Sequence, residues 1–167
     1  MRKFVIVGLT LIVIAAIAIA ARDYVFYGLN EVATGQMGMA EIVLPSGKLV
    51  WLRRQSYAHT PEHLYISASD SYCAPYSIWH DYKLPPSVTG DTSSPLVFSF
   101  EGNTIVVHAP DEPKSPWLFA PKSFKVAFQK LASSEYAAYA TLPAGSNRLP
   151  TGWHRVEVPY GHNTCSL

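Results

Sequence analysis

The chain opens with an apolar segment that cannot remain in water and therefore stands apart from any globular fold. Residues 4–21 (FVIVGLTLIVIAAIAIAA) are 18 in a row without a charge, and Arg2 and Lys3 precede them. A stretch of this kind inserts into a bilayer, and basic residues on its N-terminal flank keep that flank in the cytoplasm. We therefore predict that residues 1–22 are a signal-anchor or signal peptide and that the rest of the chain lies outside the cytoplasm.

The fate of this segment is left open by two opposing signals. The run Ala18-Ile19-Ala20 has the small-x-small pattern after which signal peptidase cuts, and a cut after Ala20 would leave a soluble periplasmic or secreted protein. The length of the segment and the aromatic rings of Tyr24, Phe26 and Tyr27 favour retention as a single-pass anchor, because aromatic rings suit the bilayer interface. We expect an inner-membrane protein with its domain in the periplasm.

The remaining composition indicates one folded domain. Residues 23–39 are predicted to be a glycine-containing juxtamembrane linker, and residues 40–167 a β-rich extracytoplasmic domain, a size that suits a single core. Outside the N-terminal segment, ten Lys and Arg face twelve Asp and Glu, and the basic residues are scattered along the sequence. This balance argues against a nucleic-acid partner or an anionic membrane surface.

Two hairpins are the clearest local structures. AEIVL and KLVWLRRQ flank the turn residues Pro45-Ser46-Gly47, and PLVFSFEGNTIVVHAP turns at Gly102-Asn103. Across the second turn Phe100 faces Ile105 and Phe98 faces Val107 on the core side. The opposite side of this hairpin is predicted to be wet or partner-facing, and it carries Val97, Ser99, Glu101, Thr104, Val106 and His108.

Further short elements complete a mainly β prediction. Residues 63–69, 123–131 and 154–160 have strand character, residues 132–142 favour a short helix, and Thr60-Pro61-Glu62 indicates a turn or helix start. Five to seven short strands with turn signals suggest a sandwich or a partly open barrel, with one short helix.

The two cysteines, Cys73 and Cys165, are an even count in an exported chain, so we predict one disulfide between them. A nucleophilic role for Cys73 would require a neighbouring base and a lowered thiol pKa, and the sequence shows neither. The predicted bridge would tie the C-terminal tail to the middle of the domain.

No catalytic residue, metal site or cofactor is predicted. His59-Thr60-Pro61-Glu62-His63 matches the H-x-x-E-H zinc pattern, but Pro61 prevents the two histidines from sharing one helical face. The adjacent pair His80-Asp81 would point to opposite faces of a strand, and His108, His154 and His162 are isolated in the sequence. A G-x-S-x-G elbow and a phosphate-binding glycine loop are also missing from the sequence.

An unusual aromatic stretch, residues 72–82, supplies the candidate binding surface. Exposed rings anchor protein interfaces or stack on sugars, whereas rings beside a disulfide more often fill a small core. The prolines around the stretch favour a long ordered loop, and such loops are commonly functional. The candidate binding residues are Tyr72, Tyr76, Trp79, Tyr82, Arg53, Arg54 and Asp70.

These observations favour a membrane-anchored extracytoplasmic protein-interaction module whose partner is another envelope protein. It would serve as a subunit of an envelope complex or as an inhibitor or immunity protein for a toxic enzyme. The alternative is a carbohydrate-binding module, which requires Tyr76, Trp79 and Tyr82 to be exposed and roughly coplanar. A small hydrolase is a third class, and it requires histidines or carboxylates that converge in a pocket.

Overall fold

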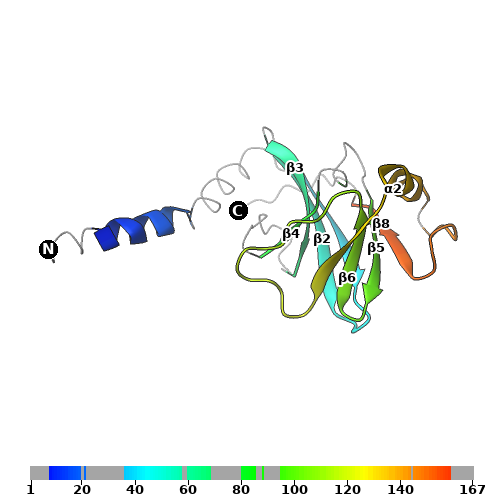
Figure 1. Cartoon of the computed structure of the whole chain (residues 1–167), viewed down its shortest axis with the longest axis horizontal. Coiled ribbons are helices and arrows are strands. Elements are labelled where there is room, and N and C mark those ends of the chain that lie inside the picture. The colour runs from blue at the N-terminus through cyan, green and yellow to red at the C-terminus, as the bar shows by residue number, and fades with distance from the viewer. Residues whose placement is uncertain are drawn as a thin grey trace.

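The computed structural model of the chain describes residues 8–19, 21, 36–57, 60–68, 80–85, 88, 95–143 and 145–158. Residues 8–19 form an N-terminal helix with exposed apolar side chains, and this helix stands clear of two packed sheets (Figure 1). Within these residues, no helix combines the length and the apolar character that crossing a bilayer requires.

Two four-stranded sheets make up the described part of the domain, as the mainly β prediction expects. Sheet A is antiparallel, with the order β1 (Gln36–Val43), β2 (Leu49–Tyr57), β3 (Thr60–Ser67) and β4 (Tyr82–Lys83). Sheet B is mixed, with the order β7 (Lys125–Lys130), β6 (Thr104–Ala109), β5 (Leu96–Glu101) and β8 (Trp153–Val156).

The core lies between the two sheets, an arrangement that fits a β-sandwich. Alternate side chains along each strand point into it, as a period of two requires. Sheet A contributes Ile42, Val50, Leu52, Leu64 and Ile66, and sheet B contributes Leu96, Phe98, Ile105, Val107 and Ala109. The core therefore draws on residues that lie far apart in the sequence.

Both predicted hairpins are confirmed. Val43 pairs with Leu49 around the first turn, in which Gly47 adopts a φ of 80°. In the second, Phe100 pairs with Ile105 and only Gly102 of the two loop residues has a positive φ, 59°. A positive φ at the first position alone is what a type II′ turn requires, so glycine there sets the turn.

Two strands begin where the sequence indicates other structure. β1 starts at Gln36, within the predicted linker 23–39, because pairing with β2 compensates for the weak strand propensity of its glycine and alanine. Thr60 and Pro61 open β3 instead of a helix, so the helix-start prediction is wrong. The β2–β3 register shifts between Gln55 and Tyr57, and an irregular position of this kind tolerates a proline.

The connection between β6 and β7 was not anticipated from the sequence. These strands are parallel, so the chain must cross from the end of one to the start of the other, and residues 110–124 do so without a helix. We call these residues the crossover loop. Lys114 of the loop forms a two-bond antiparallel bridge with Lys83 at the edge of sheet A, with N–O distances of 2.8 and 3.0 Å.

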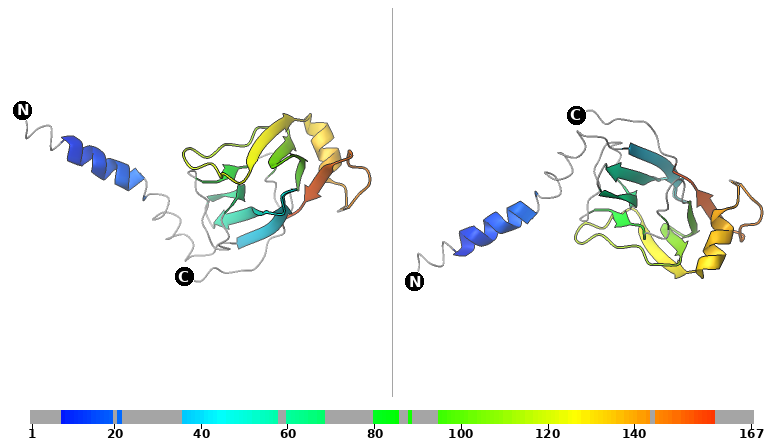
Figure 2. Two further views of the ribbon diagram at one scale, coloured as in Figure 1. Left: turned by 90° about the horizontal axis from the view of Figure 1, so that it is seen from below. Right: turned by 90° about the horizontal axis from the view of Figure 1, so that it is seen from above.

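The short helix α2 (Ser133–Ala140) confirms the prediction for residues 132–142 and covers the outer face of sheet B (Figure 2). The hydroxyl of Tyr136 donates to the carbonyl of Pro95 at 2.7 Å, and burial raises the pKa of this phenol to about 12 against the opposing effect of Arg155. Arg155 donates to the Ala140 carbonyl at 2.9 and 3.1 Å, which places a cation at the negative end of the helix.

Because α2 covers it, the side of the second hairpin that was predicted to face solvent or a partner is largely buried. Val97, Val106 and His108 lie beneath the layer that α2 adds, and Glu101 remains exposed at the hairpin end. The sequence pattern distinguished the two sides of the hairpin correctly. It did not show that a helix from later in the chain folds back over the second side.

Candidate functional site

The described members of the predicted binding set are buried side chains of sheet A. Arg53 and Arg54 point to opposite faces of β2, and Arg54 Nη1 donates to the carbonyl of Val158 at 3.0 Å. Tyr82 lies in β4, is 7 % exposed and packs against Phe124 with ring centroids 6.1 Å apart. The other predicted residues lie outside the described residues: Asp70, Tyr72, Tyr76, Trp79, and the cysteines Cys73 and Cys165 of the predicted disulfide.

Part of the outer face of sheet A is a buried polar layer. Arg53 of β2 pairs with Tyr65 of β3. Ile66 of β3 pairs with Tyr82 of β4, so the next residues along the two chains, Ser67 and Asp81, lie opposite each other. The four side chains of the Arg53–Tyr65 and Ser67–Asp81 pairs, and that of Gln55, are buried, and each has an interaction partner. A buried polar group with a partner is stabilised in place, so this layer belongs to the scaffold.

The other part of the same face is apolar and exposed, and we call it the sheet A patch. It consists of Val43, Leu49 and Trp51. Val43 and Leu49 pair directly across β1 and β2 and are 56 % and 50 % exposed, and half-buried Trp51 follows on the same face of β2. The patch is thus a flat surface on two paired strands.

A second exposed apolar surface, the loop tip, lies on the crossover loop. Trp117, Leu118 and Phe119 follow one another along the chain and are 69 %, 67 % and 61 % exposed. The imidazole of His80 stacks on Phe119, with ring centroids 5.2 Å apart and planes inclined by 22°. In both views of Figure 2 the yellow-green loop projects on the side of the domain away from α2.

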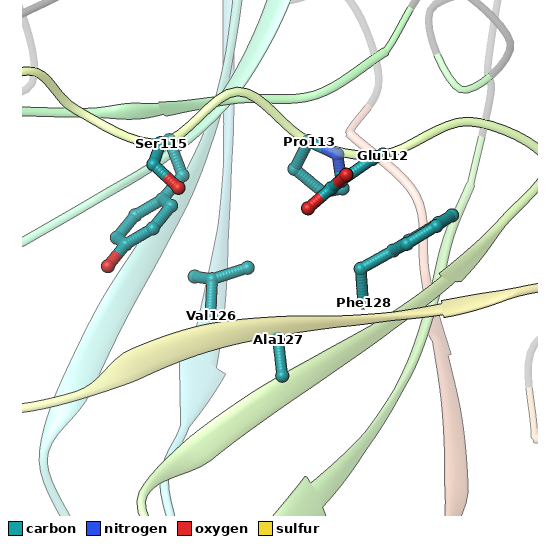
Figure 3. Close-up of a pocket in the computed structure, with 7 residues that line it drawn as sticks. Glu112, Pro113, Ser115, Val126, Ala127 and Phe128 are labelled. Atoms are coloured by element: carbon teal, nitrogen blue, oxygen red, sulfur yellow. The ribbon is translucent and has the colours of Figure 1, made fainter.

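A small pocket lies between the crossover loop and β7, with an empty volume of about 260 Å³ that includes open solvent (Figure 3). Val126 and Phe128 point toward the loop, while Ala127 between them points away. The lining holds one carboxylate, from Glu112, and the hydroxyls of Ser115 and Tyr82. Burial raises the pKa of the Tyr82 phenol, and a backbone hydrogen bond from Val126 lowers it in part.

Among the described residues, one arrangement resembles catalytic geometry, a pair of side chains under α2. His108 Nε2 lies 2.8 Å from Ser99 Oγ, within the reach that a base and a nucleophile need. His108 is 1 % exposed, however, and the indole of Trp153 stacks on its ring at 3.6 Å with planes 6° apart. A ring covered in this way leaves no space for a substrate, so the pair is structural.

Protonation of His108 is disfavoured by the same packing. Burial lowers the pKa of the imidazole below its ordinary value of 6.5, and its Nδ1 atom has no hydrogen-bond partner. Tyr139 of α2 meets Trp153 edge to face at 5.4 Å and completes the stack. The layer is therefore built around a neutral histidine.

Metal chemistry finds no support in the described ranges, where no three His, Cys, Asp or Glu side chains come together as ligands. The H-x-x-E-H run is placed in part: Thr60–His63 lies in strand β3, and His59 lies outside the described residues. Neighbours along a strand point to opposite faces, so this backbone does not provide the helical geometry that the zinc pattern needs. His80 and Asp81 lie just before β4, and His80 is exposed whereas Asp81 is buried.

Neither apolar surface was identified from the sequence, although one carried a signal. The run Pro116-Trp117-Leu118-Phe119-Ala120-Pro121 places three large apolar residues in succession between two prolines. Such a run does not alternate as a half-buried strand does, and consecutive exposed apolar residues are unusual unless they have a function. The sheet A patch carried no comparable signal, because its residues have an ordinary strand pattern.

Comparison of the chain with protein-family models, with curated proteins and with solved structures gives no match.

Proposed function

We propose that this chain is a membrane-anchored extracytoplasmic interaction module that binds another envelope protein through the sheet A patch. The observation that carries the proposal is the exposure of the Val43–Leu49 pair at the hairpin end of a sheet face whose other described side chains are largely buried. Exposed apolar side chains grouped on one face mark interaction sites more often than single ones do.

The shape and charge of the patch fit a protein partner. Two paired strands present a flat surface, and Trp51 adds an aromatic side chain of the kind that concentrates binding energy at interfaces. The neighbouring charged residues, Glu41 and Lys48, are of opposite sign, so the patch has an apolar centre and a polar rim. Protein interfaces have this same organisation.

The anchor and the disulfide belong to the proposal on the strength of the sequence. Residues 4–21 would hold the domain at the outer face of the inner membrane, and the Cys73–Cys165 bridge would form in the oxidising periplasm. A subunit of an envelope complex and an inhibitor or immunity protein for a toxic enzyme are the two forms that such a module would take.

The glycan-binding alternative has less support. It needs Tyr82 at the surface together with Tyr76 and Trp79, whereas the ring of Tyr82 is packed against Phe124 in the core. A ring that is held inside the sandwich cannot stack on a sugar face.

The test is detergent extraction of the full chain from its native cells, affinity purification and mass spectrometry. We expect one stoichiometric partner that is lost in the double variant Val43→Ser with Leu49→Ser and retained in the control Trp117→Ser with Phe119→Ser. Equal recovery with both variants would show that the patch is not the binding surface. The same spectra report whether the mature chain begins at Met1 or at Ala21.

A further inference from the structure

The loop tip projects from a loop that is fixed at both ends. The crossover loop is attached to sheet A through the Lys83–Lys114 bridge and to sheet B through β7, into which it runs. Trp117, Leu118 and Phe119 lie between these two attachments and are each more than half exposed. Their exposure is therefore a property of a tethered loop whose ends are fixed in both sheets.

The crossover loop begins with two exposed acidic residues, Asp111 and Glu112, but the charged residues from Lys114 to the start of α2 are all lysines. Residues 113–134 contain four lysines and no Asp or Glu, in a chain whose overall net charge is only +1. Glu112, the nearest acidic residue before this stretch, lines the pocket beside β7. The fold adds Lys83 to this basic region.

Lys83 and Lys114 lie directly opposite each other in the bridge. Like charges in opposed positions destabilise a pair of strands, and burial together with the Lys114 charge lowers the pKa of Lys83. The bridge therefore places a second basic residue beside Lys114, at the base of the loop that carries the apolar tip.

We propose that the loop tip inserts into the interfacial layer of a lipid bilayer, with Lys114 and Lys122 on anionic headgroups. Trp and Phe rings prefer the level of the headgroups, and lysines at this depth are attracted to anionic lipids. The loop tip thus contacts lipid, and the sheet A patch stays free for the protein partner. The inference is independent of the partner proposed above.

The convex form of the tip separates it from the sheet A patch as a docking surface. A narrow loop can displace headgroups and bury its side chains in the acyl boundary, whereas a flat sheet face cannot enter a bilayer without its flanking strands. The tip also combines apolar and basic groups, which is the composition of membrane-surface segments. The patch is bordered by one lysine, Lys48, and one glutamate, Glu41.

The proposed anchor would make even weak insertion effective. Residues 22–35 separate the apolar segment from β1, and a chain of this length extends at most about 50 Å. A tether that short keeps the domain at a high effective concentration near the bilayer. The anchor would then bring the domain to the bilayer, and insertion of the tip would set the orientation of the domain relative to the membrane.

The experiment uses the full chain reconstituted into phosphatidylcholine vesicles with and without phosphatidylglycerol, some made with brominated acyl chains. Bromine quenches tryptophan fluorescence on contact, and the difference between wild type and Trp117→Phe isolates the Trp117 signal. We expect this signal to be quenched at least about twofold, as insertion at the interface requires. Trp51→Phe is the matched control, since removal of a tryptophan from the sheet A patch should leave the quenched component intact.

Two further variants separate the apolar and the electrostatic contributions. Leu118→Ser with Phe119→Ser should release Trp117 from quenching in both kinds of vesicle, because the tip loses most of its apolar surface. Lys114→Gln and Lys122→Gln should each lower the ratio of inserted to free tip about fivefold, and only with phosphatidylglycerol present. If Trp117 stays unquenched in both vesicles, or cross-links to a protein in native membranes instead, the inference is overturned while binding at the sheet A patch is unaffected.

Discussion

The two sheets of this domain differ in how the chain treats their outer faces. Sheet B is covered by α2, so Val97, Val106 and His108 are buried although they point away from the core between the sheets. Sheet A has a comparable apolar pair, Val43 and Leu49, that remains half exposed at the hairpin end. The same strand pattern therefore gives a helical cover over sheet B, whereas on sheet A the outer face is buried around Arg53 and Tyr65 and exposed at the hairpin end.

The two sheets therefore differ in whether the domain itself buries the apolar side chains on the outer face. On sheet B, burial under α2 is joined to specific bonds from Tyr136 and Arg155. On sheet A, apolar surface is left in water, which costs free energy that a partner would recover by covering it. We therefore regard the cover on sheet B as scaffold and the uncovered patch on sheet A as a docking face.

The largest expected effect tests whether α2 is an integral cover. Tyr136→Ala removes a buried ring and its hydrogen bond to Pro95, and should lower the free energy of unfolding by about 3 kcal/mol or more. Tyr136→Phe, the matched control, removes only the hydroxyl and should cost about 1 kcal/mol. Urea unfolding followed by circular dichroism measures both, and a negligible loss in Tyr136→Ala would mean that α2 is not part of the folded scaffold.

A matched pair of valines compares the two outer faces directly. Val97→Ala, beneath α2, should reduce the free energy of unfolding by about 2 kcal/mol because it opens a cavity at a fully buried site. Val43→Ala on the sheet A patch should change it by no more than about 0.5 kcal/mol. Equal losses in urea titrations of the two variants would remove the distinction between covered and open faces.

The buried histidine makes the covered face sensitive to pH. Burial lowers the folded-state pKa of His108 below 6.5, so the unfolded chain binds the proton more readily and acid favours unfolding. The stability that this neutral ring contributes is complete above about pH 6.5 and is lost as the pH falls toward the lowered pKa. Melting temperatures measured between about pH 8 and 5 should therefore fall less in His108→Gln than in the wild type.

Ser99→Ala provides the control for this pH dependence. It removes the hydroxyl that meets His108 Nε2 but leaves the imidazole stacked on Trp153, so the fall in melting temperature with acid should persist. An unchanged pH profile in His108→Gln would assign the acid sensitivity to other groups.

The smallest expected effect concerns the loop tip. Leu118→Ser replaces an exposed side chain, so the free energy of unfolding should change by less than about 0.5 kcal/mol. A loss of several kcal/mol in urea unfolding would show that the tip packs within the domain in solution. The tip and the sheet A patch would then no longer be comparable as open surfaces.

Features set by neighbouring residues were predictable from the sequence. The turns at Gly47 and Gly102, the alternation along the second hairpin and the short helix α2 all depend on local chemistry, and all three appear where they were expected. The parallel β6–β7 pair was missed because its contacts span the crossover loop, and no local signal specifies where such a loop lands.

The candidate surfaces were harder to predict than the fold. The aromatic stretch 72–82 drew attention by composition, yet Tyr82 serves the core because β4 pairs with β3 at its position. Exposure of Val43 and Leu49 depends on which sheet face α2 covers, which is decided by tertiary packing far from these residues. A strand pattern alone cannot tell a covered outer face from an open one.

The most direct test of the docking face is site-specific photo-cross-linking in native membranes. A photoreactive side chain at Leu49 lies in the centre of the sheet A patch, and one at Glu101 lies at the exposed tip of the second hairpin as a control. The account predicts one dominant protein adduct from position 49 and none from position 101. Absence of an adduct at position 49, or the same adducts from both positions, would contradict it.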